Sequence, residues 1–111
     1  MTKKSDWKVY DMPEENTTFT MEMALSDENI RWLKEGFLPR SMEDKWFTYY
    51  ENNKYYFHRS WTGYCIYIVE IMNSTTIKVT VNKNEEQYGI SEIEKEKKRA
   101  KKIIEHFARI A

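Results

Sequence analysis

The stretch that decides the fold runs from Trp46 to Val81 and reads WFTYYENNKYYFHRSWTGYCIYIVEIMNSTTIKVTV. It is dense in aromatic and β-branched residues, which favour strands, and turn-forming residues interrupt it at short intervals. The interruptions are Asn-Asn, Thr-Gly and Asn-Ser-Thr. This pattern predicts consecutive β-hairpins over the whole stretch.

The turns predict how the strands pair. The segment Asn52-Asn53 suits a two-residue hairpin loop, because asparagine tolerates the positive φ that such turns require. Counting outward from this loop gives three cross-strand pairs: Tyr50 with Tyr55, Thr48 with Phe57, and Trp46 with Arg59. Taking Trp61-Thr62 as the next loop gives two more pairs, Arg59 with Tyr64 and His58 with Cys65. A bulge at Gly63 would shift this second register by one residue.

Strand alternation then assigns the side chains of the sheet to two faces. The first face is expected to form the main core and holds Phe47, Tyr49, Tyr56, His58, Cys65, Tyr67, Val69, Ile71, Ile77, Val79 and Val81. The second face holds Trp46, Tyr50, Tyr55, Phe57, Arg59, Tyr64, Ile66, Ile68 and Glu70. Because the second face is too apolar to lie bare, we expect a helix, a ligand or another subunit to cover part of it.

The flanking segments add one strand and two helices. Residues 17–23 alternate apolar and polar side chains as a half-buried strand does, whereas residues 1–6 are polar and expected to fray. Ser26 is a predicted N-cap for a short helix to about Glu35, which Gly36 would end. Ser91 is the predicted cap of a last helix that runs to the end of the chain. The narrow apolar stripe of this helix consists of Ile93, Ala100, Ile104, Phe107 and Ala111.

We therefore predict a single α+β domain over residues 1–111. Its centre is an antiparallel meander of four strands from about Lys45 to Asn82. One N-terminal strand extends the sheet to five, and the short and the long helix pack against each other. A chain of 111 residues is long enough to bury a core of this kind.

Composition excludes several classes of function. The 18 basic residues balance the 18 acidic ones, so nucleic-acid binding is disfavoured. No apolar run approaches the roughly 20 residues of a membrane helix, which argues against a membrane protein. The one cysteine, Cys65, forms no internal disulfide, and no secretory leader opens the chain, so a cytoplasmic location is expected. Nothing indicates a cofactor, and two histidines with one cysteine match no zinc spacing.

The segment around Arg59 is the leading candidate for a ligand site. A guanidinium suits phosphate or carboxylate, hydroxyls and turn amides can donate to an anion, and large rings can stack on a base. The predicted ligand-binding residues are Arg59, Trp61, Ser60, Thr62, Tyr64, Trp46 and Arg40. An alternative is that Arg59 only stacks on Trp46 and Tyr64 as a cation–π contact, while Ser60 and Thr62 form the turn.

Catalytic interpretations are weaker. His58 and Cys65 are predicted cross-strand neighbours, but both fall on the core face with no third residue to orient the imidazole, so a structural role is favoured. The adjacent carboxylates Glu43 and Asp44 point apart and suit a solvated loop or an ion pair. The charged run at residues 95–102 has interspersed glutamates, as on a solvated helix. No catalytic residue is assigned, and the balance of these residues is against an enzyme, although the question stays open.

The segments WFTYY (residues 46–50) and FHRSWTGYCIY (residues 57–67) resemble the core of a small bacterial and phage module. This module is associated with proteins that carry ADP-ribosylglycohydrolase or macrodomain-type units. The likeness covers roughly Leu25 to Glu70 and is strongest at Arg59-Ser60-Trp61-Thr62-Gly63. It implies contact with molecules derived from NAD or similar to ADP-ribose, in phage–host immune signalling, and it assigns no catalytic residue.

Three functions remain open at this point. The first is a non-catalytic module that binds a small phosphorylated aromatic ligand, such as a nucleotide or an ADP-ribose-like molecule. A homodimer that hides the second sheet face fits the same surface. The second is a protein-interaction or inhibitor module with a Trp/Tyr/Arg surface. The third is a nucleotide-processing hydrolase, which requires His58 or a carboxylate in the same pocket as Arg59.

Overall fold

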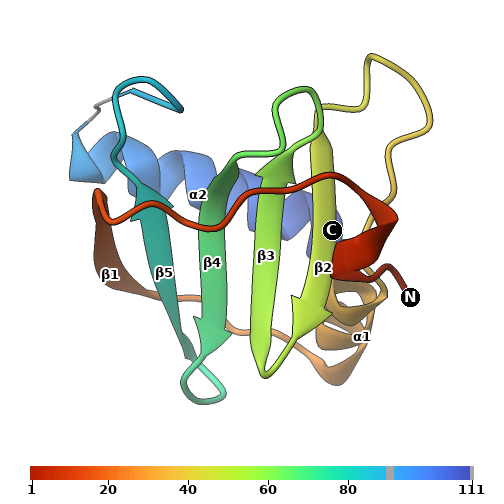
Figure 1. Ribbon diagram of the computed structural model, residues 1–111. Helices are drawn as coiled ribbons and strands as arrows, with labels where there is room; N and C mark the ends of the chain where they lie inside the picture. The colour runs from red at the N-terminus through yellow and green to blue at the C-terminus, as the bar shows by residue number, and fades with distance from the viewer. Residues whose placement is uncertain (90–91, 111) are drawn as a thin grey trace.

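The computed structural model describes residues 1–89 and 92–110 and confirms the α+β class. Five strands form one antiparallel sheet in the order β1-β5-β4-β3-β2 (Figure 1). The strands are β1 (Asn16–Glu22), β2 (Trp46–Glu51), β3 (Lys54–Arg59), β4 (Cys65–Ile71) and β5 (Thr76–Asn82). The helices are the short 3-10 turn η1 (Lys4–Asp6), α1 (Asp27–Glu35) and α2 (Ile93–Ala108). The meander therefore has its predicted extent, and β1 extends it by pairing with β5.

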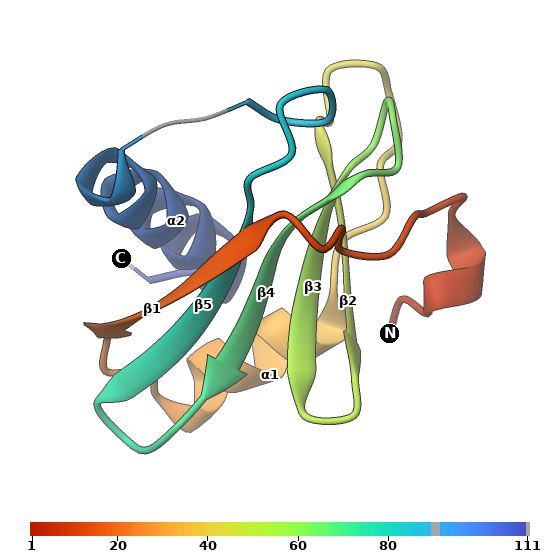
Figure 2. The same cartoon turned by 60° about the vertical axis from the view of Figure 1, so that its left-hand side comes forward.

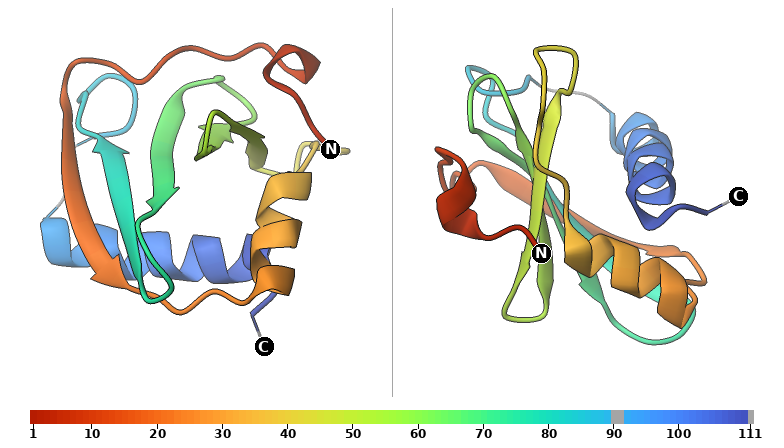
Figure 3. Two further views of the ribbon diagram at one scale, coloured as in Figure 1. Left: turned by 90° about the horizontal axis from the view of Figure 1, so that it is seen from below. Right: turned by 90° about the vertical axis from the view of Figure 1, so that its right-hand side faces the viewer.

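The sheet lies between two unequal layers. Both α1 and α2 cover one face, while residues 1–15, which include η1, cross the other face (Figures 2 and 3). Ala100 and Ile104 of the predicted stripe are buried against the sheet, together with Ala108, which was not predicted. Ile93, at the start of the stripe, is 36% exposed. The predicted cap at Ser91 and the last residue of the predicted stripe, Ala111, lie outside the described residues.

Turn chemistry fixes the first hairpin as expected. Asn52 and Asn53 have φ values of 52° and 65°, the left-handed conformation that a tight hairpin loop needs. Trp46 consequently faces Arg59 across β2 and β3, and the other two predicted pairs of this hairpin form as well.

The second hairpin overturns the predicted division into faces. His58 pairs with Cys65 as expected, but Phe57 pairs with Tyr67 because the register shifts between Phe57 and His58. A bulge adds one residue to one strand, and each later side chain then emerges on the opposite side. Five further residues of the predicted first face move with Tyr67, and they are Val69, Ile71, Ile77, Val79 and Val81.

The main core therefore lies on the face predicted to be secondary, beneath the helices. Tyr55 and Phe57 are buried there with the residues that changed sides, and α1 adds Leu33. Phe47, Tyr49, Tyr56 and His58 occupy the opposite face, where the expected main core does not form. The chain's own segments therefore lie over both faces of the sheet, with the two helices on one face and residues 1–15 across the other.

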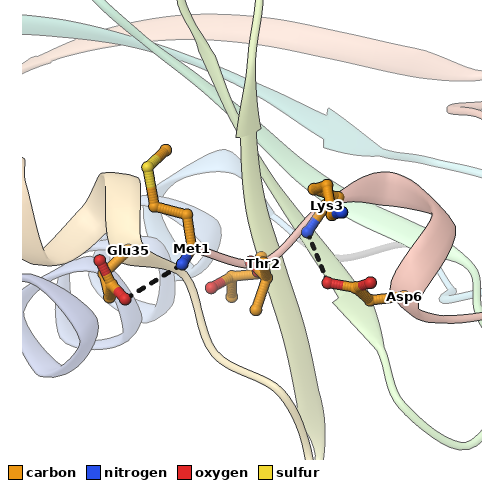
Figure 4. A network of polar contacts seen from close by, with 6 residues as sticks. Met1, Thr2, Lys3, Asp6 and Glu35 are labelled. Atoms are coloured by element: carbon orange, nitrogen blue, oxygen red, sulfur yellow. Dashed lines mark hydrogen bonds and ion pairs between the residues drawn. The ribbon is translucent and has the colours of Figure 1, made fainter.

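The N-terminal segment is held in place and does not fray. The Met1 ammonium pairs with the Glu35 carboxylate at 3.2 Å (Figure 4). The Thr2 amide donates to the Glu35 carbonyl at 2.9 Å. Further along, the Trp7 indole donates to the Ser60 carbonyl at 2.9 Å and stacks on Phe47. The segment thus anchors at α1 and again at the turn after β3.

The end of α1 supplies the first testable prediction. Ser26 caps the helix by accepting from the Asn29 amide, and Gly36 ends it at φ 77° and ψ −176°, a region that only glycine adopts readily. A Cβ at Gly36 would also collide with Thr2 Oγ1 and the Thr48 carbonyl. We expect Gly36→Ala to lower the free energy of unfolding by about 1–3 kcal/mol in urea titrations.

Gly89→Ala is the matched control for this substitution. Gly89 also has a positive φ, 105°, but an added Cβ would meet no atom within 4 Å among the described residues beyond its chain neighbours. Gly89→Ala should therefore lower the free energy of unfolding only through the strain of its positive φ. If Gly89→Ala and Gly36→Ala lower the free energy of unfolding equally, the proposed collision at Gly36 is contradicted.

Candidate functional site

The strand ends near Arg59 form the site. Arg59 and Trp46 are cross-strand partners, and the guanidinium carbon lies 5.0 Å from the centre of the indole ring. Trp46 in turn stacks on Tyr67, with ring centres 6.1 Å apart and planes 24° apart. The three side chains form one stack on the helix-covered side of the sheet, so the predicted common side of Arg59 and Trp46 is confirmed.

A hollow of about 290 Å³ opens beside this stack. Three of its lining residues belong to the predicted site, and they are Arg59, Trp61 and Thr62. The other three were not predicted, and they are Lys45, Gln87 and Tyr88. Lys45 immediately precedes β2, whereas the last two come from the connection between β5 and α2. The hollow therefore lies where two loops far apart in sequence meet over the end of the sheet.

The connection is tied down by a buried asparagine. Asn82 Nδ2 donates to the Cys65 carbonyl at 2.8 Å and to Gln87 Oε1 at 2.9 Å, while Asn82 Oδ1 accepts from the Asn84 amide. These bonds attach the loop to the neighbouring strand β4. They fix where Gln87 and Tyr88 stand at the wall of the hollow.

A buried polar network lies behind Tyr88. Glu96 of α2 is 2% exposed and accepts a hydrogen bond from the Tyr67 hydroxyl at 2.9 Å. The Tyr88 hydroxyl donates to the same carboxylate at 3.0 Å and accepts from Arg99 Nη1 at 2.6 Å. The network joins β4, the loop and α2, so that the wall of the hollow is held from behind.

The charged side chains that line the hollow are basic, although the Glu96 carboxylate lies behind Tyr88. Arg59 and Lys45 line the hollow, Arg99 stands behind Tyr88, and none of the described lining residues is acidic. Burial lowers the pKa of Arg59, and the like charge of Arg99 lowers it further. No described residue forms a salt bridge with Arg59. An arginine that is partly desolvated and faces like charges favours a bound anion.

The remaining predicted site residues have other neighbours. Ser60 Oγ donates to the Asp44 carbonyl at 2.7 Å, and Thr62 Oγ1 accepts from the Tyr64 amide. The ring of Tyr64 packs on Tyr10, 5.6 Å between centres. Ser60 thus fastens the turn, while Tyr64 meets the N-terminal segment.

Trp61 joins the hollow to a second one. Its side chain is 68% exposed, and its indole donates to the Met42 carbonyl at 2.8 Å. Arg40 lines the second hollow, of about 440 Å³, together with Met42, Ser60 and Trp61. Arg40 therefore stands beside the candidate site, separated from it by the indole of Trp61.

His58 and Cys65 lie away from this site. Each is 1% exposed, on the sheet face that residues 1–15 cross, where His58 stacks on Tyr49 and Tyr56. Neither residue lines the hollow beside Arg59. The hydrolase hypothesis thereby loses its best base, and no described carboxylate lines the hollow to replace it.

The chain matches no protein-family model, no curated protein and no solved structure. Within residues 1–89 and 92–110, no helix has the length and apolarity to cross a membrane.

Proposed function

We propose that this protein binds a small phosphorylated aromatic molecule, a nucleotide or an ADP-ribose-like ligand, in the hollow beside Arg59. The observation that carries the proposal is the guanidinium of Arg59, stacked on Trp46 at the wall of a hollow that contains a second cation and an exposed indole. The binding protein has no catalytic role in this proposal, and it acts in the cytoplasm.

The phosphate would meet the cations. Trp46 stacks on one side of the planar guanidinium of Arg59. The N–H groups at the edge of the guanidinium can then donate two parallel hydrogen bonds to phosphate oxygens. Lys45 adds a mobile point charge on the same hollow, and Gln87 adds an amide donor. Arg99 contributes through space from behind Tyr88.

The aromatic part of the ligand would stack on Trp61. Trp61 presents most of its surface to solvent, and such an exposed ring adjoining cations is a common platform for a base. Trp46 and Tyr64 already have ring partners within the chain, so they support the site and do not stack on the ligand. The resemblance to modules associated with macrodomain-type proteins also favours an ADP-ribose-like ligand.

The test is calorimetric titration of the protein with ADP-ribose, NAD, AMP and cyclic nucleotides. We expect Arg59→Ala to weaken the best of these ligands by about 1.5–3 kcal/mol, or about 10-fold to 150-fold in Kd, because a hydrogen-bonded charge is lost. Arg31→Ala is the matched control, since Arg31 lies on α1 in an exposed pair with Glu28. Absence of binding to every phosphorylated ligand, or equal losses for the two variants, would refute the proposal.

A protein-interaction function is the second candidate, and one observation favours it. Two large apolar side chains that line the second hollow are exposed: Met42 at 76% and Trp61 at 68%. Exposed tryptophan and methionine beside arginine are typical of interface hot spots. A homodimer was expected because it would hide the apolar second face of the sheet. That reason no longer applies, because α1 and α2 cover this face.

A further inference from the structure

We propose that His58 and Cys65 together bind one soft, monovalent metal ion, of which copper(I) is the biological example. The site is a separate hollow of about 270 Å³ between the N-terminal segment and the face of strands β2 to β4. His58 and Cys65 both line it, together with the thioether side chain of Met12. It is independent of the hollow beside Arg59.

His58 is prepared as a metal ligand. Its Nδ1 lies 2.9 Å from the Gly63 carbonyl, and since a carbonyl only accepts, Nδ1 carries the proton and Nε2 keeps a lone pair. Burial lowers the pKa of His58, which favours this neutral form. Metal-binding histidines are usually oriented in this way, through a hydrogen bond from the other ring nitrogen to a carbonyl.

The lone pair of His58 has no partner within the chain. Among the buried side-chain nitrogen and oxygen atoms of the described residues, Nε2 of His58 is the one without a hydrogen bond. Buried polar atoms in folded proteins rarely lack a partner, and those that do often serve to bind an ion or a water molecule. The ring is held by stacking on Tyr49, with planes 16° apart, so Nε2 has a defined direction.

Cys65 supplies the second ligand. It is the direct cross-strand partner of His58, and side chains so paired have Cβ atoms about 4.5–5.5 Å apart, within reach of one bridging ion. The buried thiol makes only a long contact to the Tyr67 carbonyl, at 3.8 Å. The thiol is therefore available to exchange its proton for a metal ion.

Ligand number and charge select the class of metal. No group of three or more His, Cys, Asp or Glu side chains in the described residues is placed to hold a metal ion, which disfavours zinc and hard cations. Thiolate, neutral imidazole and a monovalent ion sum to zero charge. A divalent ion would leave a net positive charge on these two buried ligands, at a desolvation cost. The hollow is also lined by Lys4 and Asp11, which pair with each other at 3.3 Å, and by Glu51, and all three are exposed at its rim. Soft sulfur ligands also favour copper(I), and the Met12 thioether is a third soft donor.

Binding exchanges one proton for one ion and transfers no electron. The Cys65 thiol loses its proton to solvent as the sulfur–metal bond forms, while the His58 tautomer is unchanged. Protons therefore compete with the ion for the Cys65 sulfur, and the apparent affinity should fall as the pH is lowered.

The test is an anaerobic titration of the reduced protein with copper(I) in competition with a coloured copper(I) chelator, repeated with silver(I). We expect one ion per chain, no competitive binding by Cys65→Ser, and a loss of at least about 10-fold in affinity for His58→Gln. His106→Gln is the matched control, because His106 is the other histidine and lies exposed on α2. It should bind as the parent protein does.

Retention of full binding by Cys65→Ser would overturn the proposal, since the exposed methionines Met1, Met42 and Met72 would then be adventitious ligands. Circular dichroism would check that each variant folds. Should either variant fail to fold, the parent protein still decides the question. One ion must release one proton and must protect Cys65 from a thiol reagent, and failure of either would refute the site.

Discussion

Raising the pH above about 9 is expected to unfold this protein cooperatively before pH 12. Burial raises the pKa of Cys65 to about 12 from its usual 9.0, and burial with the nearby Tyr50 raises the pKa of Tyr55 to about 12 from 10.0. Burial raises the pKa of Tyr49 and of Tyr67 as well. The folded protein therefore holds its protons at pH values where the unfolded chain has lost them.

The sign of the effect follows from proton linkage. A group whose pKa is higher in the folded state contributes stability that is complete below its unfolded pKa and is lost as the pH rises toward the folded value. For Cys65 and Tyr55 together this amounts to up to about 7 kcal/mol, at 1.36 kcal/mol per pKa unit. Such a loss is comparable with the whole stability of a small domain, about 5–15 kcal/mol.

The measurement follows tyrosinate absorbance and circular dichroism in one alkaline titration under reducing conditions. The absorbance of the buried tyrosines should appear together with the loss of secondary structure. Tyr55→Phe is the matched variant, because it removes one titrating group, and no described residue hydrogen-bonds to that hydroxyl. Its unfolding midpoint should move to higher pH. Ionisation of every tyrosine in a chain that keeps its native dichroism would contradict the prediction.

Local chemistry made the hairpins and helix caps predictable. Asn52-Asn53 carries the conformation of its turn in its own residues, and Ser26 followed by Gly36 defines both ends of α1 in the same way. Signals of this kind depend on a few neighbouring residues. Turns and caps can therefore be predicted without knowing how the rest of the chain folds.

The bulge between Phe57 and His58 could not be predicted in the same way. It depends on which backbone groups of β3 and β4 pair, and either register satisfies the alternation of each strand taken alone. Because a shift of one residue inverts a face, this one feature moved Tyr67 and its successors to the core under the helices. The N-terminal segment was missed for a related reason, because its partners Glu35, Ser60 and Gly63 lie far along the chain.

Three of the six residues that line the candidate site could not be predicted from neighbouring residues in the sequence. Arg59 and Trp61 were predicted because they stand in one short segment, whereas Gln87 and Tyr88 reach the hollow through a loop whose path depends on Asn82. Glu96 did leave a signal. It precedes Ala100 and Ile104 at four-residue spacing, so it lies on the apolar stripe of α2, where an acidic residue needs a buried partner.

Glu96→Ala is expected to lower the free energy of unfolding by about 2–5 kcal/mol. The substitution removes the acceptor of two tyrosine hydroxyls, and each buried hydroxyl left unsatisfied costs about 1–3 kcal/mol. It also removes the negative charge closest to Arg99 within the described network, so that the two guanidiniums near the hollow repel each other without compensation. Denaturant unfolding of the variant and the parent protein measures the loss.

Glu96→Gln separates the charge from the hydrogen bonds. Glutamine keeps the shape and one acceptor oxygen, so its cost should be smaller than that of alanine and should come mainly from the lost charge. The same loss of charge behind Tyr88 should strengthen phosphate binding in the hollow, because an anion there no longer meets a neighbouring carboxylate. Glu96→Gln should thus lower the free energy of unfolding and raise the affinity for the phosphorylated ligand.

Lys95→Gln, on an exposed position of the same helix, should change neither quantity appreciably. If Glu96→Gln unfolds at the same denaturant concentration as the parent protein, the buried carboxylate does not support this wall of the site.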